Sequence, residues 1–122
     1  MTNFIFKETK RVTPAPYQAE LAAVGEVDGK FGPQLRADFR IVAGQFKGEL
    51  ISQWVSLTFN SVPIQPTSRN KLGRLLTSLN AGPFDDGASI DPAKFVGQTY
   101  TVVVIETDKG RVAIDSITAP MS

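Results

Sequence analysis

The side chains of this chain that could do chemistry are cations, hydroxyls, carboxylates and a single tryptophan. The 122-residue sequence contains neither cysteine nor histidine. Thiol nucleophiles, disulfides and thiolate or imidazole metal ligands are therefore excluded, and a serine nucleophile would lack its usual general base. What remains is the noncovalent chemistry of charge pairing, hydrogen bonding and ring stacking.

The tryptophan, Trp54, lies in the stretch ISQWVSLTF, in which residue types alternate. Alternation with a period of two predicts a β-strand with one apolar face and one polar face. The apolar face would carry Ile51, Val55, Leu57 and Phe59, together with Gln53. The opposite face would carry Trp54 among Ser52, Ser56 and Thr58. A large aromatic ring is therefore expected to point away from the core.

The preceding stretch QLRADFRIV, residues 34–42, alternates in the same way. Its apolar face would carry Leu35, Ala37, Phe39 and Ile41. Arg36 and Arg40 fall on the polar face. Since the short turn AGQFKG joins the two stretches, we expect a hairpin whose outer face combines these arginines with Trp54.

Positive charge is concentrated in the middle of the sequence. The formal net charge is only +1, but residues 30–74 hold seven basic and two acidic side chains, a net +5. This pattern predicts one basic face that could meet an anion. The alternative is that basic and acidic segments interleave in space and cancel.

The order of predicted elements is three strands, one helix and two strands. The strands are expected at 17–27, 34–42, 50–59, 98–107 and 111–117. The helix is expected over 68–82, because Leu72, Leu75, Leu76 and Leu79 form one apolar stripe. Ser68 would cap its start and Gly82 would end it.

This order predicts an all-β fold, a five-stranded OB barrel with its helix between strands three and four. The chief alternative is a β-sandwich, or an open sheet with one helix packed on it. Residues 15–120 would form this domain. Residues 1–14 would form an arm that docks on its own barrel or on a neighbouring subunit, with a partly frayed tag as the alternative. Pro14 and Pro16 would prevent a regular ladder there.

OB folds usually hold ligands across strands two and three, between the loops that follow strands one and four. The candidate site residues on these elements are Lys30, Phe31, Arg36, Arg40, Lys47, Ser52, Trp54, Ser56, Lys109 and Arg111. Cations neutralise phosphates, and flat rings stack on unpaired bases. This combination is typical of surfaces that bind single-stranded nucleic acid.

Three stretches also resemble a known group of proteins. GKFGPQLRADFRIVAGQFKGELIS, SRNKLGRLLTSL and FVGQTYTVVV look like the layout of small phage and bacterial OB-fold proteins, some of which bind single-stranded DNA. The resemblance covers roughly residues 17–120. It implies an OB fold and single-stranded DNA binding in phage-like replication or recombination. The last residues, SITAPMS, contain no acidic run, so we do not expect the recruitment of partners through an acidic C-terminal tail that is common among such proteins.

The leading hypothesis is therefore a non-enzymatic, cytoplasmic protein that binds single-stranded DNA, with RNA as the alternative polymer. We expect no cofactor and no metal. We expect a homodimer, formed through the arm. Asp85, Asp86 and Asp91 could hold Mg²⁺, but carboxylates in such turn-rich segments are usually solvated or cap helices. Arg69, Lys71 and Arg74 are expected to be solvated, with contact to an anionic ligand as the alternative.

The second hypothesis is a protein-interaction or assembly module of a larger complex, with Trp54 and Phe31 as interface anchors. Trp54 also has two structural explanations. Phe4 or Phe6 of the arm could stack on it, or a bulge could shift the register and turn it inward. No apolar run approaches the length of a membrane span, and the N-terminus MTNFIFKETKRV reverses the order of a signal peptide.

Overall fold

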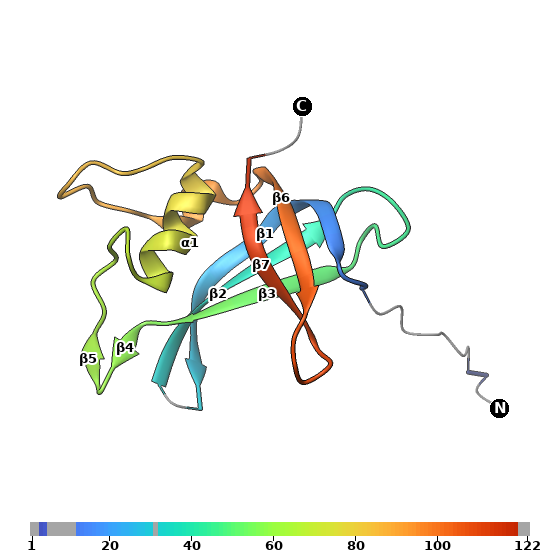
Figure 1. Cartoon of the computed structure of the whole chain (residues 1–122), viewed down its shortest axis with the longest axis horizontal. Helices are drawn as coiled ribbons and strands as arrows, with labels where there is room; N and C mark the ends of the chain where they lie inside the picture. The colour runs from blue at the N-terminus through green and yellow to red at the C-terminus, as the bar shows by residue number, and fades with distance from the viewer. Residues whose placement is uncertain (1–2, 5–11, 31, 120–122) are drawn as a thin grey trace.

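The computed structural model describes residues 3–4, 12–30 and 32–119. Five strands form one antiparallel sheet in the order β3-β2-β1-β6-β7 (Figure 1). The strands are β1 (Ala15–Gly29), β2 (Gly32–Ile41), β3 (Leu50–Ser56), β6 (Thr99–Glu106) and β7 (Val112–Thr118). A second, two-stranded sheet pairs β4 (Thr58–Phe59) with β5 (Val62–Pro63). One α-helix, α1 (Lys71–Asn80), and a 3₁₀ turn, η1 (Pro92–Phe95), lie between β5 and β6.

The prediction of a closed OB barrel was wrong. The sheet is strongly curved, and its outer strands β3 and β7 approach each other with Cα atoms within 8 Å, but no ladder joins them among the described residues. Both strands therefore keep one unpaired edge. The helix follows the fifth strand of the chain and does not lie between strands three and four. The arrangement is the open sheet with one helix that the sequence left as an alternative.

The extra strands arise because the predicted third strand breaks into two. The ladder of β3 ends at Ser56, and the chain then forms the hairpin β4–β5. Asn60 and Ser61 make its turn with φ values of 49° and 65°. Consecutive positive φ angles are typical of the two-residue turns that suit hairpins. Since the alternation of residue types runs unbroken through 51–59, the sequence pattern did not reveal this break.

The first strand is longer than predicted. β1 begins at Ala15, and Pro16 lies in register opposite Val103, so the expectation that Pro16 prevents a ladder was wrong. Pro16 is the second residue of the strand, where the loss of one N–H donor is tolerated. The pairing of β1 with β2 has a register irregularity between Leu21 and Ala23. Just before β1, Val12 is buried in the core.

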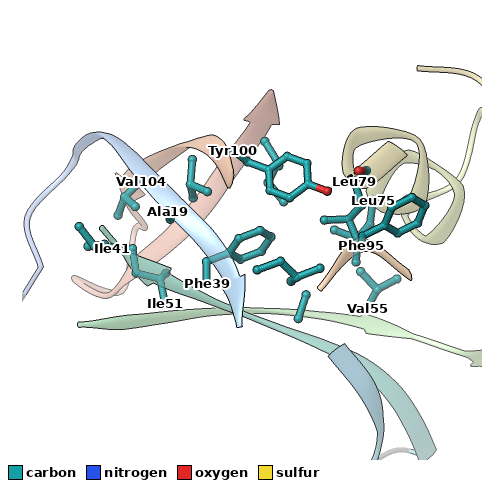
Figure 2. Close-up of a cluster of buried hydrophobic side chains, with 14 of the residues drawn as sticks. Ala19, Phe39, Ile41, Ile51, Val55, Leu75, Leu79, Phe95, Tyr100 and Val104 are labelled. Carbon is teal, nitrogen blue, oxygen red and sulfur yellow. Dashed lines mark hydrogen bonds between the residues drawn. The ribbon is translucent and has the colours of Figure 1, made fainter. Parts of the chain in front are cut away.

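The core lies inside the curve of the sheet, and α1 packs against one end of it (Figure 2). Phe39 and Tyr100 are both nearly fully buried and meet edge to face, with ring centroids 6.1 Å apart. The predicted leucine stripe of the helix is confirmed, because Leu72, Leu75, Leu76 and Leu79 are all buried. Burying each such side chain contributes about 1.5–3 kcal/mol, so α1 is held mainly by this stripe.

The ends of α1 differ from the prediction. Asn70, not Ser68, caps the start, and its side chain accepts a hydrogen bond of 2.7 Å from the Gly73 N–H. The helix ends at Asn80, and Ala81 adopts the left-handed conformation with φ of 56°. Tyr100 donates a hydrogen bond from its hydroxyl to the Leu79 carbonyl oxygen and so ties the helix end to β6.

Gly73 brings the preceding loop onto the helix. A Cβ atom at this position would lie 1.7 Å from the Thr67 carbonyl oxygen, so only glycine fits. This contact fixes where the first turn of α1 lies. None of the described helices is long and apolar enough to cross a membrane.

Candidate nucleic-acid interface

Trp54 lies on the outer face of the sheet, as the alternation predicted. Ile51 and Val55 on the same strand are buried, whereas 51% of Trp54 is exposed. The pairing of β2 with β3 contains no register shift, so a bulge does not turn the ring inward. Phe59, which the pattern assigned to the core face, is 72% exposed because it belongs to β4.

Arg36 is the neighbour of Trp54 across the ladder. Its guanidinium carbon lies 5.5 Å from the centroid of the indole ring, within the range of a cation–π contact. Arg36 also donates from Nε to Oδ1 of Asp38 at 2.8 Å. Ser52 donates its hydroxyl to the same carboxylate oxygen. Asp38 therefore holds Arg36 over Trp54, and Ser52 supports Asp38.

Small residues of β1 leave this part of the outer face open. Gly25 lies opposite Arg36, and Ala23 lies opposite Asp38. A Cβ atom built on Gly25 would meet no atom within 4 Å. One row of neighbouring residues therefore crosses three strands: Gly25, Arg36 and Trp54. Only Arg36 and Trp54 have large side chains, so a flat ligand can approach both of these.

Arg40 lies on the same outer face, one step from the end of β2. It is exposed and faces Leu50 on one side and Glu20 on the other. Four residues separate it from Arg36, which corresponds to about 13 Å along the strand. The two arginines therefore lie on either side of Asp38 and could contact separate phosphates of one extended strand.

A hollow of about 330 Å³ opens beside Trp54, where β3 and β7 fail to pair. We call it the Trp54 hollow. Its walls come from β3, α1, β6 and β7 and include Gln53, Trp54, Lys71, Arg74, Ile114 and Asp115. Gln53 and Trp54 both reach it, although they point to opposite faces, because β3 is an edge strand.

Lys71 and Arg74, which the sequence led us to expect as solvated, are both exposed. Both also line the Trp54 hollow from the first half of α1. The spacing of three residues places them on one side of a helix, a signal present in the sequence. That this side meets Trp54 depends on how α1 packs against the sheet edge, which periodicity does not reveal.

Several predicted site residues lie away from Trp54. Lys47 belongs to the loop between β2 and β3, at the opposite end of the sheet from the β1–β2 hairpin (Figure 1). That loop is anchored by buried Phe46, whose ring meets Tyr17 edge to face at 5.9 Å. Lys109 and Arg111 are exposed in the β6–β7 turn, and Arg111 precedes Asp115 by four residues, about 13 Å of strand.

The remaining predicted residues border the outer face. Ser56 is exposed at the end of β3, opposite Gln34. Lys30 is exposed in the turn between β1 and β2, and Phe31 lies outside the described residues. Phe4 is 91% exposed and so does not stack on Trp54, while Phe6 also lies outside the described residues.

A second hollow, of about 540 Å³, lies between the loops on either side of α1. It is larger, but its walls carry Asp85 and Asp86 and no cation. A polyanion would be repelled there, so we assign the candidate interface to the Trp54 side. Asp91 accepts a hydrogen bond from the Ala93 N–H and caps η1. No group of three or more metal-binding side chains occurs in the described part of the chain.

The arrangement on the Trp54 side can bind an anionic ligand that also carries a flat ring. Arg36, Lys71 and Arg74 supply charge around one exposed indole. The sequence matches no model of a known protein family, and no curated protein matches it.

Proposed function

We propose that this chain is a non-enzymatic protein that binds single-stranded DNA on the outer face of β2 and β3. The observation that carries the proposal is the position of the Arg36 guanidinium over the half-exposed ring of Trp54. When the two groups are in contact, the guanidinium can bind a phosphate while the exposed part of the indole ring stacks on the neighbouring base. Lys71 and Arg74 extend the positive charge along α1.

The energetics favour an unpaired strand over a duplex. Stacking of one base on an aromatic ring is worth about 1–3 kcal/mol and needs a free base face. Bases in a duplex are already stacked on their neighbours, so a duplex would offer mainly its phosphates. Each phosphate neutralised by an arginine or lysine releases counterions, which makes binding weaken as salt rises.

The biological setting of the proposal is phage-like DNA replication or recombination. The resemblance of three stretches of the sequence to small phage and bacterial single-stranded DNA-binding proteins supports this setting. The resemblance no longer supports a closed barrel, because the sheet is open.

The test is fluorescence anisotropy with labelled oligonucleotides of mixed sequence. Single-stranded DNA, duplex DNA and single-stranded RNA of equal length are titrated with the wild-type chain at low and moderate salt. The proposal predicts binding to single-stranded DNA that is tighter than binding to the duplex and that weakens with salt. Equal or stronger binding to the duplex would contradict it, and stronger binding to RNA would replace DNA as the polymer.

A separate observation favours a second candidate function, that of a protein-interaction module. The β4–β5 hairpin exposes Phe59 and Val62, at 72% and 63%, on either side of its turn. Exposed apolar side chains at a hairpin tip suit a protein interface, including one between two copies of this chain. Light scattering on wild type and Phe59→Ser tests this. A dimer that the substitution dissociates, together with no affinity for oligonucleotides, would favour it over DNA binding.

A further inference from the structure

The Trp54 hollow has properties that stacking and phosphate contact do not use. Besides Trp54, Lys71 and Arg74, it contains the carboxylate of Asp115 and the amide of Gln53. The Asp115 carboxylate is exposed and forms no ion pair within 4.0 Å in the described part of the chain. It would repel a phosphate placed next to it, whereas it can accept hydrogen bonds from a ligand that carries donors.

A peptide strand is a poor occupant of this gap. Inserting a strand between β3 and β7 would require the two edges to stand about 9.5 Å apart, twice the spacing of paired strands. Their Cα atoms approach within 8 Å. The volume of about 330 Å³ instead falls at the lower end of the range typical of small-ligand sites. The hollow therefore fits a compact planar group better than a polypeptide.

Arg36 is not part of the Trp54 hollow. Its guanidinium lies over the indole ring and is paired with Asp38, but the residue does not line the hollow. A ligand in the hollow therefore need not contact Arg36 or break its ion pair with Asp38.

We infer that the Trp54 hollow binds one unpaired base through its amino group, with Asp115 as the hydrogen-bond acceptor and Gln53 as its neighbour. The inference rests on the proposed function, since it names the base class that the same site prefers. A carboxylate can only accept hydrogen bonds, so it suits a base that carries an amino group, and the N4 amino group of cytosine is the usual partner of aspartate among the bases. The O4 carbonyl of uracil or thymine at the same place would be repelled.

Gln53 can complete this recognition. Its amide offers both a donor and an acceptor, and its side chain is half-buried on the edge strand beside Trp54. With Asp115 on the amino group, the Gln53 N–H donors can meet the ring nitrogen or carbonyl of cytosine. The flanking phosphates would then lie near Lys71 and Arg74, which line the same hollow from α1.

The test compares oligo(dC) with oligo(dU) of equal length at pH 7.5. The two bases differ on one edge: position 4 is an amino donor in cytosine and a carbonyl acceptor in uracil, and N3 is an acceptor in cytosine and a donor in uracil. The variants at Asp115 then separate the contribution of the amino group from that of N3. The wild-type chain is titrated with each by anisotropy, and the ratio of the two dissociation constants is the readout. We expect oligo(dC) to bind at least about fivefold more tightly, the lower end of discrimination by a base-edge contact.

Asp115→Asn removes the charge and adds a donor, so we expect it to bring this ratio close to one. Asp108→Asn is the matched control, because Asp108 is an exposed carboxylate in the β6–β7 turn and outside the hollow. Both substitutions change the net charge equally and should tighten overall binding similarly. Only the first should change the ratio. Asp115→Ser, which is also expected to lose the preference, serves as a second variant, and thermal melting verifies that each variant folds.

The outcomes separate the inference from the proposed function. The inference would be overturned if the wild type bound oligo(dC) and oligo(dU) equally, or if the preference were unchanged in Asp115→Asn. Either result would still be consistent with binding of single-stranded DNA. No binding to either oligonucleotide would overturn both. A preference for oligo(dC) that disappears only with the Asp115 variants would establish the base site.

Discussion

The guanidinium of Arg36 lies 5.5 Å from the centre of the Trp54 ring and is held there by Asp38, which accepts from Arg36 Nε at 2.8 Å. This contact joins two neighbouring strands at the rim of an open sheet. It explains why the lone tryptophan sits among hydroxyl residues, since the ring packs against a cation instead of the core. The same contact places charge beside an exposed aromatic face.

Trp54→Ala should weaken binding to single-stranded DNA by about five- to a hundredfold, the equivalent of losing one stacked base. Thermal stability should change little, because half of the side chain is exposed. Anisotropy titration and a melting curve measure the two effects. Trp54→Phe keeps an aromatic ring and should retain most of the affinity. Equal affinity of Trp54→Ala and wild type would remove the stacking role.

Arg36→Ala combined with Arg40→Ala should lower the slope of log affinity against log salt. Each lost phosphate contact to a single strand reduces this slope by about 0.7. The measurement is a titration series across salt concentrations. Lys94→Ala is the single-charge control, because Lys94 is exposed in η1, outside β2, β3 and the Trp54 hollow, and should leave the slope unchanged. A larger change from Lys94→Ala than from the arginine pair would contradict the assignment of the interface to the outer face of β2 and β3.

Gly73→Ala should destabilise the fold strongly. The added Cβ would stand 1.7 Å from the Thr67 carbonyl oxygen, so either the loop or the first turn of α1 must move. Overpacking of this kind costs about 1–3 kcal/mol. Gly25→Ala is a control with free space around its Cβ, and its urea midpoint should stay close to that of wild type. Similar urea midpoints for both variants would contradict this prediction, because the loop around Thr67 would then move aside without loss of stability.

Tyr100→Phe should lower the free energy of unfolding by about 1–3 kcal/mol at neutral pH, because the Leu79 carbonyl oxygen loses its donor. Burial raises the pKa of Tyr100 above its ordinary value of 10.0. In the wild type, the unfolded chain releases this proton near pH 10 while the folded chain keeps it. Stability is therefore fully present below pH 10 and falls as the pH rises toward the pKa of the folded state.

The phenylalanine variant lacks that proton, so its alkaline loss of stability should be smaller than in the wild type. Urea unfolding at pH 7 and at alkaline pH measures both effects. Tyr17→Phe is the control, since the Tyr17 hydroxyl donates to Thr13 near the start of β1 and not to the helix. An alkaline loss that is identical in wild type and Tyr100→Phe would show that Tyr100 does not contribute to it.

Strands and the helix could be predicted from the sequence where burial alone determines the pattern of apolar residues. The strand 34–42 and the leucine stripe of α1 follow from burial of every second residue and of one helix face. The outward position of Trp54 followed from the same rule. These features need only neighbours along the chain and one apolar environment.

The closure of the sheet was not predictable in this way. It depends on whether β3 and β7 come into hydrogen-bonding register, and no residue pattern within either strand encodes that distance. Phe59 was misplaced because alternation continues across the break at Leu57, where Asn60 and Ser61 turn the chain back. Lys71 and Arg74 join Trp54 only through the packing of α1 against the sheet edge.

The most direct measurement is the intrinsic fluorescence of Trp54, the only tryptophan of the chain, during titration with single-stranded DNA at two salt concentrations. Stacking of a base on the ring should quench the emission to saturation, and the midpoint should move to higher DNA concentration as salt rises. Duplex DNA should quench less at the same concentration. Emission that stays unchanged at saturating single-stranded DNA would contradict the proposed role of Trp54.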